Sequence, residues 1–175
     1  PHVLTEDGLR TTMADFGAVL RPGGLLFIQN RNLDAVLERR ERWMPLQARQ
    51  EGTPGQPGAG EWLFVRFYDL NADGTLTFHV VTLEREGAET WKQRRDETVL
   101  YPWRHDQLVA AAAEAGFDDI RCYGDMAGSP YDRVKSGNLV LTAIQSGRDT
   151  EERVVCVFWR LSRATMASGT WKTFR

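Results

Sequence analysis

The chain has 175 residues, of which 42% are hydrophobic, and a formal net charge of −2 from 22 basic and 24 acidic side chains. That length and apolar content suffice for one domain with a buried core. The balanced charge gives no electrostatic reason to expect nucleic acid or an anionic membrane as partner, and no apolar run approaches a membrane span. Cys122 and Cys156 are isolated, which fits two reduced thiols better than a disulfide or a metal site. We therefore expect a cytoplasmic protein.

The first expected element is a helix over residues 5–20. Thr5 can cap its amino end, and Glu6 and Asp7 in the first turn suit the positive end of the helix dipole. Pro22 and the glycine after it end the helix. The apolar side chains that recur at helical spacing, and should form one buried stripe, are Leu9, Met13, Phe16 and Leu20.

An apolar run at 25–29 follows at once and predicts a strand covered on both faces, as in the parallel sheet of an α/β domain. The polar residues Asn30, Arg31 and Asn32 come directly after it, where ligands bind in open α/β sheets. Arg31 could hold a carboxylate through two parallel charge-assisted hydrogen bonds. The alternative is a polar turn whose side chains satisfy their own backbone, and spacing alone favours that alternative.

After a short helix that ends near Arg40, the Gly/Pro-rich segment 51–60 is the clearest linker candidate. A set of antiparallel strands should follow, because Asp73-Gly74 is a strong hairpin signal between two β-rich runs. We expect these strands to form a separate layer that covers a pocket. Their ranges are 61–69, 75–85 and about 89–99.

The rest of the chain predicts a helix over residues 105–115 and strands near 119–123 and 138–144. Strand 25–29 should lie centrally, next to these two antiparallel strands. The tail, 146–175, is atypical, yet Val154 to Trp159 has the composition of a buried strand. We favour docking of this run within its own chain or on a dimer mate, and the alternative is a disordered extension.

Several segments resemble, in order, class I S-adenosylmethionine-dependent methyltransferases, and in particular glycine and sarcosine N-methyltransferases. They are L-R-P-G-G-L-L-F-I, I-Q-N-R-N-L-D-A-V-L, L-Y-P-W-R-H-D-Q-L-V-A-A-A-A-E-A-G-F and Y-G-D-M-A-G-S-P-Y-D. The resemblance covers about residues 1–144 and begins after the family's fourth strand. It implies an α/β fold, namely the later strands of a Rossmann-like methyltransferase sheet with an antiparallel β layer. Residues 1–145 would then be the carboxyl-terminal part of a methyltransferase domain.

The same resemblance implies roles for individual residues. Arg31 matches the arginine that holds the substrate carboxylate, and Tyr131 matches a tyrosine that lines the same pocket. Asn32 lies beside that arginine and joins the substrate-binding set. His2 falls on a histidine that lies beside the cofactor. No catalytic acid–base residue and no metal ligand is expected.

Two positions depart from the family pattern, since Asn30 replaces a histidine and Leu33 replaces a tyrosine. The acceptor therefore need not be glycine. No glycine-rich strand-to-helix turn of the kind that holds the cofactor occurs in the sequence. Because the chain begins with Pro1, we expect the cofactor-binding half upstream.

The leading hypothesis is S-adenosylmethionine-dependent methyl transfer to a small amine or amino acid by the full-length form, with this fragment inactive alone. The alternatives are a non-catalytic domain that binds a small ligand and a truncated product without function. The expected partner is a small-molecule substrate, with neither nucleic acid nor membrane. Homo-oligomers could form through the edge of strand 25–29 that loses its parallel neighbour.

Overall fold

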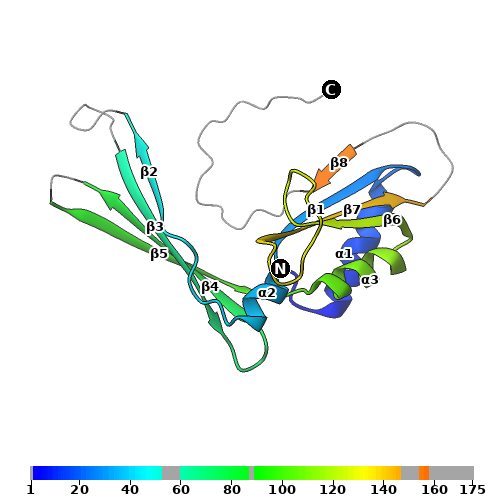
Figure 1. Ribbon diagram of the computed structural model, residues 1–175, viewed down its shortest axis with the longest axis horizontal. Coiled ribbons are helices and arrows are strands. Elements are labelled where there is room, and N and C mark those ends of the chain that lie inside the picture. The colour runs from blue at the N-terminus through cyan, green and yellow to red at the C-terminus, as the bar shows by residue number, and fades with distance from the viewer. Residues whose placement is uncertain (1, 53–59, 87–88, 147–153, 158–175) are drawn as a thin grey trace.

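The computed structural model describes residues 2–52, 60–86, 89–146 and 154–157, and these form two four-stranded sheets (Figure 1). Sheet A has the strand order β6-β7-β1-β8, with β1 Leu25–Arg31, β6 Phe117–Tyr123, β7 Asn138–Gln145 and β8 Val154–Val157. Sheet B has the order β2-β3-β4-β5, with β2 Gln47–Glu51, β3 Gly60–Leu70, β4 Leu76–Arg85 and β5 Trp91–Leu100. The helices are α1 Glu6–Val19, α2 Leu33–Glu38 and α3 His105–Glu114. The predicted α/β fold with a separate antiparallel layer is confirmed.

Strand β1 lies inside sheet A, as predicted, with one expected neighbour from 138–144 and, on its other edge, part of the 154–159 run that was favoured to dock. It pairs antiparallel with β7 along its whole length, from Leu25↔Ile144 to Arg31↔Asn138. Its other neighbour is β8, which runs parallel to it. The expectation that strand 119–123 also flanks β1 is wrong, because β6 pairs with β7 and lies one strand further out.

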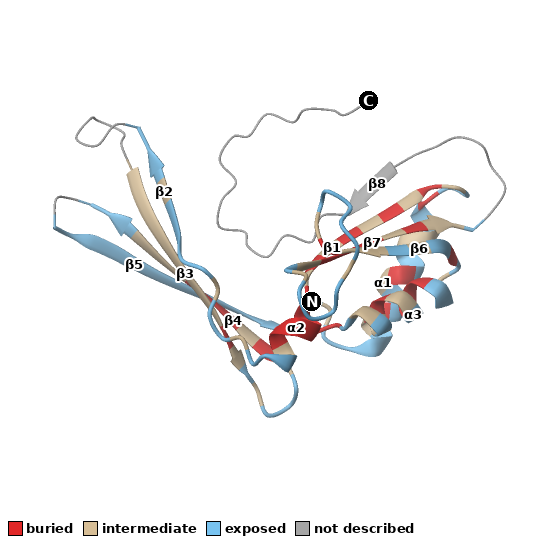
Figure 2. Ribbon diagram, in the orientation of Figure 1, coloured by how far each residue is buried: buried red, intermediate tan, exposed pale blue. Residues whose placement is uncertain are grey.

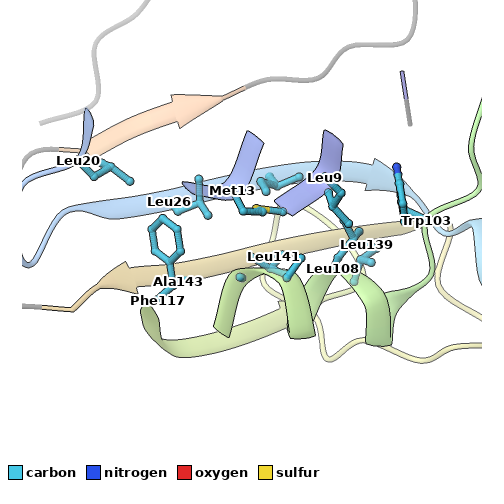
Figure 3. Packing of buried hydrophobic residues seen from close by; sticks show 13 residues of the cluster. Leu9, Met13, Leu20, Leu26, Trp103, Leu108, Phe117, Leu139, Leu141 and Ala143 are labelled. Atoms are coloured by element: carbon cyan, nitrogen blue, oxygen red, sulfur yellow. The ribbon is translucent and has the colours of Figure 1, made fainter. Parts of the chain in front are cut away.

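The main core lies between sheet A and the helices α1 and α3, which cover the same face of the sheet (Figures 1 and 3). Leu26 and Ile28 of β1 point into this core and are buried, whereas Phe27 and Gln29 alternate with them and are half-buried. Cover on both faces of β1 was expected. The described helices α1 and α3 provide this cover on one face, and cover of the other face stays a prediction.

Helix α1 begins and ends where the sequence indicates. The Thr5 hydroxyl accepts a hydrogen bond from the Gly8 amide at 3.1 Å, which satisfies one of the free amides of the first turn. After the helix, Gly23 adopts φ 78, a conformation that suits glycine. Its amide donates to the Gln145 carbonyl at 2.9 Å, and this bond fixes the start of β1 against β7.

Sheet B contains the predicted hairpin and one strand that was not predicted. Gly74 has φ 82 in the turn between β3 and β4, which explains the Asp-Gly pair there. Strand β2 has the polar sequence Gln-Ala-Arg-Gln-Glu without alternation, and it forms by pairing with β3. Residues 53–59 of the predicted linker lie outside the described residues.

A second core joins α2 to the near end of sheet B. Leu33 and Val36 of α2 pack with Tyr68, Phe78 and Leu100 of the sheet. Figure 2 shows this buried zone around α2, while the far end of sheet B is half-buried or exposed. None of the described helices is long and apolar enough to cross a membrane.

Candidate functional site

The polar residues at the carboxyl end of β1 separate onto opposite faces of sheet A. The strand extends two residues further than predicted, so Asn30 and Arg31 both belong to it and alternate. Asn30 is buried on the helix side and lines a pocket of about 30 Å³ with Met13 and Trp103. Arg31 lies on the other face. The expected cluster of three polar groups is therefore divided by the pleat of the strand.

Asn32 is 1% exposed and caps the amino end of α2. Its Nδ2 donates to the carbonyl oxygens of Arg133 and Ser136, both at 2.9 Å. Its Oδ1 accepts from the Ala35 amide at 3.3 Å and from the Tyr131 hydroxyl at 2.9 Å. Both Nδ2 and Oδ1 of Asn32 are thus hydrogen-bonded within the chain, which is what the interpretation as a polar turn requires.

Tyr131 belongs to the same network. Its ring stacks on His105 with 5.0 Å between centroids, and its hydroxyl lies 3.5 Å from Asp34 Oδ2. Burial, reinforced by the charge of Asp34, raises the pKa of the Tyr131 hydroxyl, which stays protonated at neutral pH. Buried Asp34 also accepts from the His105 amide at 2.8 Å and forms an ion pair with Arg133 at 2.9 Å, although without good hydrogen-bond alignment. This network fixes the last loop against α2 and α3.

Arg31 takes part in a different set of contacts. Its Nη2 donates to Glu41 Oε1 at 3.0 Å, and its side chain is only 19% exposed. Arg39, at the end of α2, holds the other oxygen of Glu41 at 3.2 Å. Within the part of the chain that the structure describes, no hydrogen bond or ion pair joins Arg31 to Asn32 or Tyr131. The structure therefore brings Asn32 and Tyr131 together and places Arg31 apart from them.

His2 lies in the segment that precedes α1. The residue is largely exposed, and the partial desolvation of its ring lowers its pKa. The next residue, Val3, accepts a hydrogen bond from Trp103 Nε1 at 2.8 Å. Val3 and Trp103 both line the pocket at Asn30. His2 therefore lies in a segment bordering the helix-side pocket, and its role beside a cofactor stays a prediction.

Two pockets lined by described residues are both small. The pocket at Asn30 is about 30 Å³, which is room for one or two water molecules. A cleft between α1 and α3 of about 160 Å³ is also smaller than ordinary cofactor sites. The turn from β1 to α2 contains no glycine that would let the helix start approach a ligand closely.

The comparisons with known proteins show the fold alone. No protein-family model matches the chain, and its sequence matches no curated protein significantly. The solved structures it resembles include an S-adenosylmethionine-dependent methyltransferase from Clostridium acetobutylicum, with a TM-score of 0.56 and 9% identity. They also include the CcbJ methyltransferase from Streptomyces caelestis (0.56, 19%) and DesVI from Streptomyces venezuelae (0.55, 14%).

These matches cover 82–83% of this chain but only 53–56% of the solved structures. The chain thus has the fold of part of a methyltransferase and spans about half the length of the structures it matches. The Rossmann-like methyltransferase fold was inferred from sequence, and this inference is confirmed. The predicted likeness to glycine and sarcosine enzymes in particular stays a prediction.

Glu41, Arg66 and Asp34 lie around the predicted site and were not among the residues predicted for it. Glu41 pairs with Arg31, and Arg66 and Tyr68 lie near that pair on β3. One signal was available, because Arg66 interrupts the apolar run Trp-Leu-Phe-Val-Arg-Phe-Tyr. A charged residue inside such a strand is costly unless it has a partner. Asp34 gave no such signal, since it sits in an ordinary helix start.

Proposed function

We propose that this chain provides the acceptor-binding half of an S-adenosylmethionine-dependent methyltransferase that methylates a small amine or amino acid. The observation that carries the proposal is the match of 82–83% of the chain to methyltransferase structures. Fold alone does not determine function. The polar residues at the carboxyl end of β1 provide the second support, because that edge is where open α/β sheets bind ligands.

In this proposal Arg31 holds the carboxylate of the acceptor. Its side chain is 19% exposed, so its attraction for an anion is screened less than at a free surface. A planar guanidinium also matches a carboxylate with two parallel hydrogen bonds, which fixes the orientation of a small acceptor. Alignment of acceptor and donor is the main requirement for transfer from an activated methyl donor.

Asn32 and Tyr131 would hold the backbone next to this site in place. Their mutual hydrogen bond at 2.9 Å ties the last loop to the start of α2, directly after Arg31. The raised pKa of Tyr131 keeps its hydroxyl a neutral donor. Asn30 and Leu33 differ from the glycine-type pattern, which supports an acceptor other than glycine. His2 would lie beside the cofactor.

We also propose that the cofactor is held by sequence outside these 175 residues. The chain alone should then show no tight, saturable affinity for S-adenosylmethionine, and should transfer no methyl group. Calorimetric titration of the purified chain with the cofactor tests this. Micromolar binding would mean that these residues build a cofactor site of another kind, and would refute this part of the proposal.

A further inference from the structure

Three buried hydrogen-bond donors come from the end of β1 and from β3. They are Arg31 Nε, Arg66 Nε and the Tyr68 hydroxyl, and none has a hydrogen-bond partner among the described residues. Tyr68 is 1% exposed. Folded proteins pair nearly all buried polar groups, so a group of unpaired donors calls for an explanation. A ligand that accepts hydrogen bonds would satisfy these donors.

The backbone brings the three donors to one place. Arg66 and Tyr68 are two residues apart on β3, so their side chains share a face of sheet B. The segment after α2 runs along β3, because the Tyr68 amide donates to the Arg42 carbonyl at 2.8 Å. Glu41 precedes that residue and reaches back to Arg31 at 3.0 Å. Arg31 at the end of β1 is thereby linked to the Arg66 face of β3.

The electrostatics agree with this proximity. Burial raises the pKa of the Tyr68 hydroxyl, while the positive charges of Arg31 and Arg66 act in the opposite direction. Glu41 adds to the rise. Burial also lowers the pKa of Arg66, with a further lowering from Arg31. Two guanidinium groups thus share a partly desolvated region in which Glu41 is the nearby carboxylate, and such an arrangement attracts an anion.

In the present structure the carboxylate that pairs with Arg31 is that of Glu41. It is 29% exposed, and its second oxygen is held by Arg39, whose side chain is 50% exposed. Glu41 can therefore leave Arg31 and remain paired with Arg39 at the surface. Its departure would leave the Arg31 guanidinium free to pair with another carboxylate.

We propose that Arg31, Arg66 and Tyr68 form a binding site for a single carboxylate, which takes the place of the Glu41 carboxylate on Arg31. The ligand would accept hydrogen bonds from both guanidinium groups and from the tyrosine hydroxyl. This inference rests on the proposed function, because the bound group would be the carboxylate of the methyl acceptor. It adds two recognition residues, Arg66 and Tyr68, and an internal competitor, Glu41.

The experiment uses the full chain, labelled with ¹⁵N, and follows the arginine Nε–Hε resonances by NMR during titration with sodium acetate. Sodium chloride keeps the ionic strength constant, and methylammonium chloride serves as the probe without a carboxylate. Saturable shifts of the Arg31 and Arg66 resonances are expected with acetate and not with methylammonium. Tyr68→Phe should weaken acetate binding about tenfold or more, since a hydrogen bond to a charged group is lost. Glu41→Gln should tighten it, because the competing carboxylate is gone.

Two controls separate binding from folding. Tyr68→Phe should keep or raise the melting temperature, since it removes an unpaired buried hydroxyl. Tyr101→Phe changes a partly buried tyrosine of the other core and should leave the acetate affinity unchanged. Absence of saturable shifts at Arg31 and Arg66, or unaltered affinity in Tyr68→Phe, would overturn the site. Tighter binding of inorganic phosphate than of acetate would overturn the assignment to a carboxylate.

The titration needs neither cofactor nor methyl transfer. Saturable acetate binding would support the site even if the longer protein transferred no methyl group, a result that would refute the proposed function alone. Methyl transfer by the longer protein without acetate binding here would overturn the site and leave the proposed function in place.

Discussion

Asn32 joins three parts of the chain through one side-chain amide. It caps α2, holds the carbonyls of Arg133 and Ser136 in the last loop, and accepts the Tyr131 hydroxyl. A buried amide with all these partners has a structural role whatever ligand lies nearby. The neighbouring Arg31 has the reverse character, with a buried Nε unpaired among the described residues.

Asn32→Ala should lower the free energy of unfolding by about 2–4 kcal/mol, through the lost cap and the buried carbonyls left without donors. Asn32→Asp keeps the acceptor oxygen but places a negative charge against those carbonyls, and should be no more stable than Asn32→Ala. Asn71→Ala is the control, since the side chain of half-buried Asn71 bonds locally, to the Thr75 and Thr77 hydroxyls of its own hairpin. Urea denaturation gives the comparison. Equal stability of the Asn32 and Asn71 variants would contradict the structural role.

Cys122 gives a prediction about pH. Burial raises the pKa of its thiol to about 11, so less thiolate is present at pH 8 than in the unfolded chain. In a Cys156→Ser background, alkylation of the folded protein at pH 8 should be about 100-fold slower than in denaturant, from the two-unit shift. The folded state favours the thiol form, so this contribution to stability is complete below about pH 9 and is lost between pH 9 and 11. Equal alkylation rates would show that the thiol is not shielded.

At the scale of elements, β8 is an edge strand of sheet A and covers β1. Residues Val154 to Val157 pair parallel with Leu25 to Ile28, on the edge of β1 opposite β7. An uncovered β1 would offer a row of free amides and carbonyls to another chain. Division of the chain into a methyltransferase part, 1–145, and an added tail remains a proposal.

Truncation after Ser146 should speed amide hydrogen exchange along β1 and promote self-association, because the edge of β1 is then open. Truncation after Val157 keeps β8 and is the matched control, which should behave as the full chain does. Exchange measured by NMR and sedimentation measured in parallel check the two effects. Exchange of the 154–157 amides within seconds in the full chain would contradict a docked β8.

Elements with local signals could be predicted from sequence. Thr5 and the apolar spacing after it defined α1, and Asp73-Gly74 located the hairpin in sheet B. Strand β2 could not be predicted, since its polar residues become a strand only through pairing with β3. The same limit applied to the order of strands in sheet A, because register depends on partners far away in the chain.

At the scale of the whole molecule, two sheets meet around α2, each with its own core (Figures 1 and 2). The sequence located the polar residues at the end of β1, but it could not assign their faces, since a two-residue difference in strand length decides this. It also could not place Arg66 and Tyr68 beside Arg31, because β3 is distant in sequence. A role for sheet B as a lid over a pocket stays a prediction.

The central claim is that this chain holds the carboxylate of a methyl acceptor through Arg31. The most direct test is a methyl-transfer assay of the longer protein that includes the cofactor-binding half, with labelled S-adenosylmethionine and a panel of small amines with and without a carboxylate. We predict transfer to a carboxylate-bearing amine, with Arg31→Ala weakening that acceptor by about 2–5 kcal/mol. No transfer to any amine, or an unchanged Michaelis constant for every carboxylate-bearing acceptor in Arg31→Ala, would contradict the account.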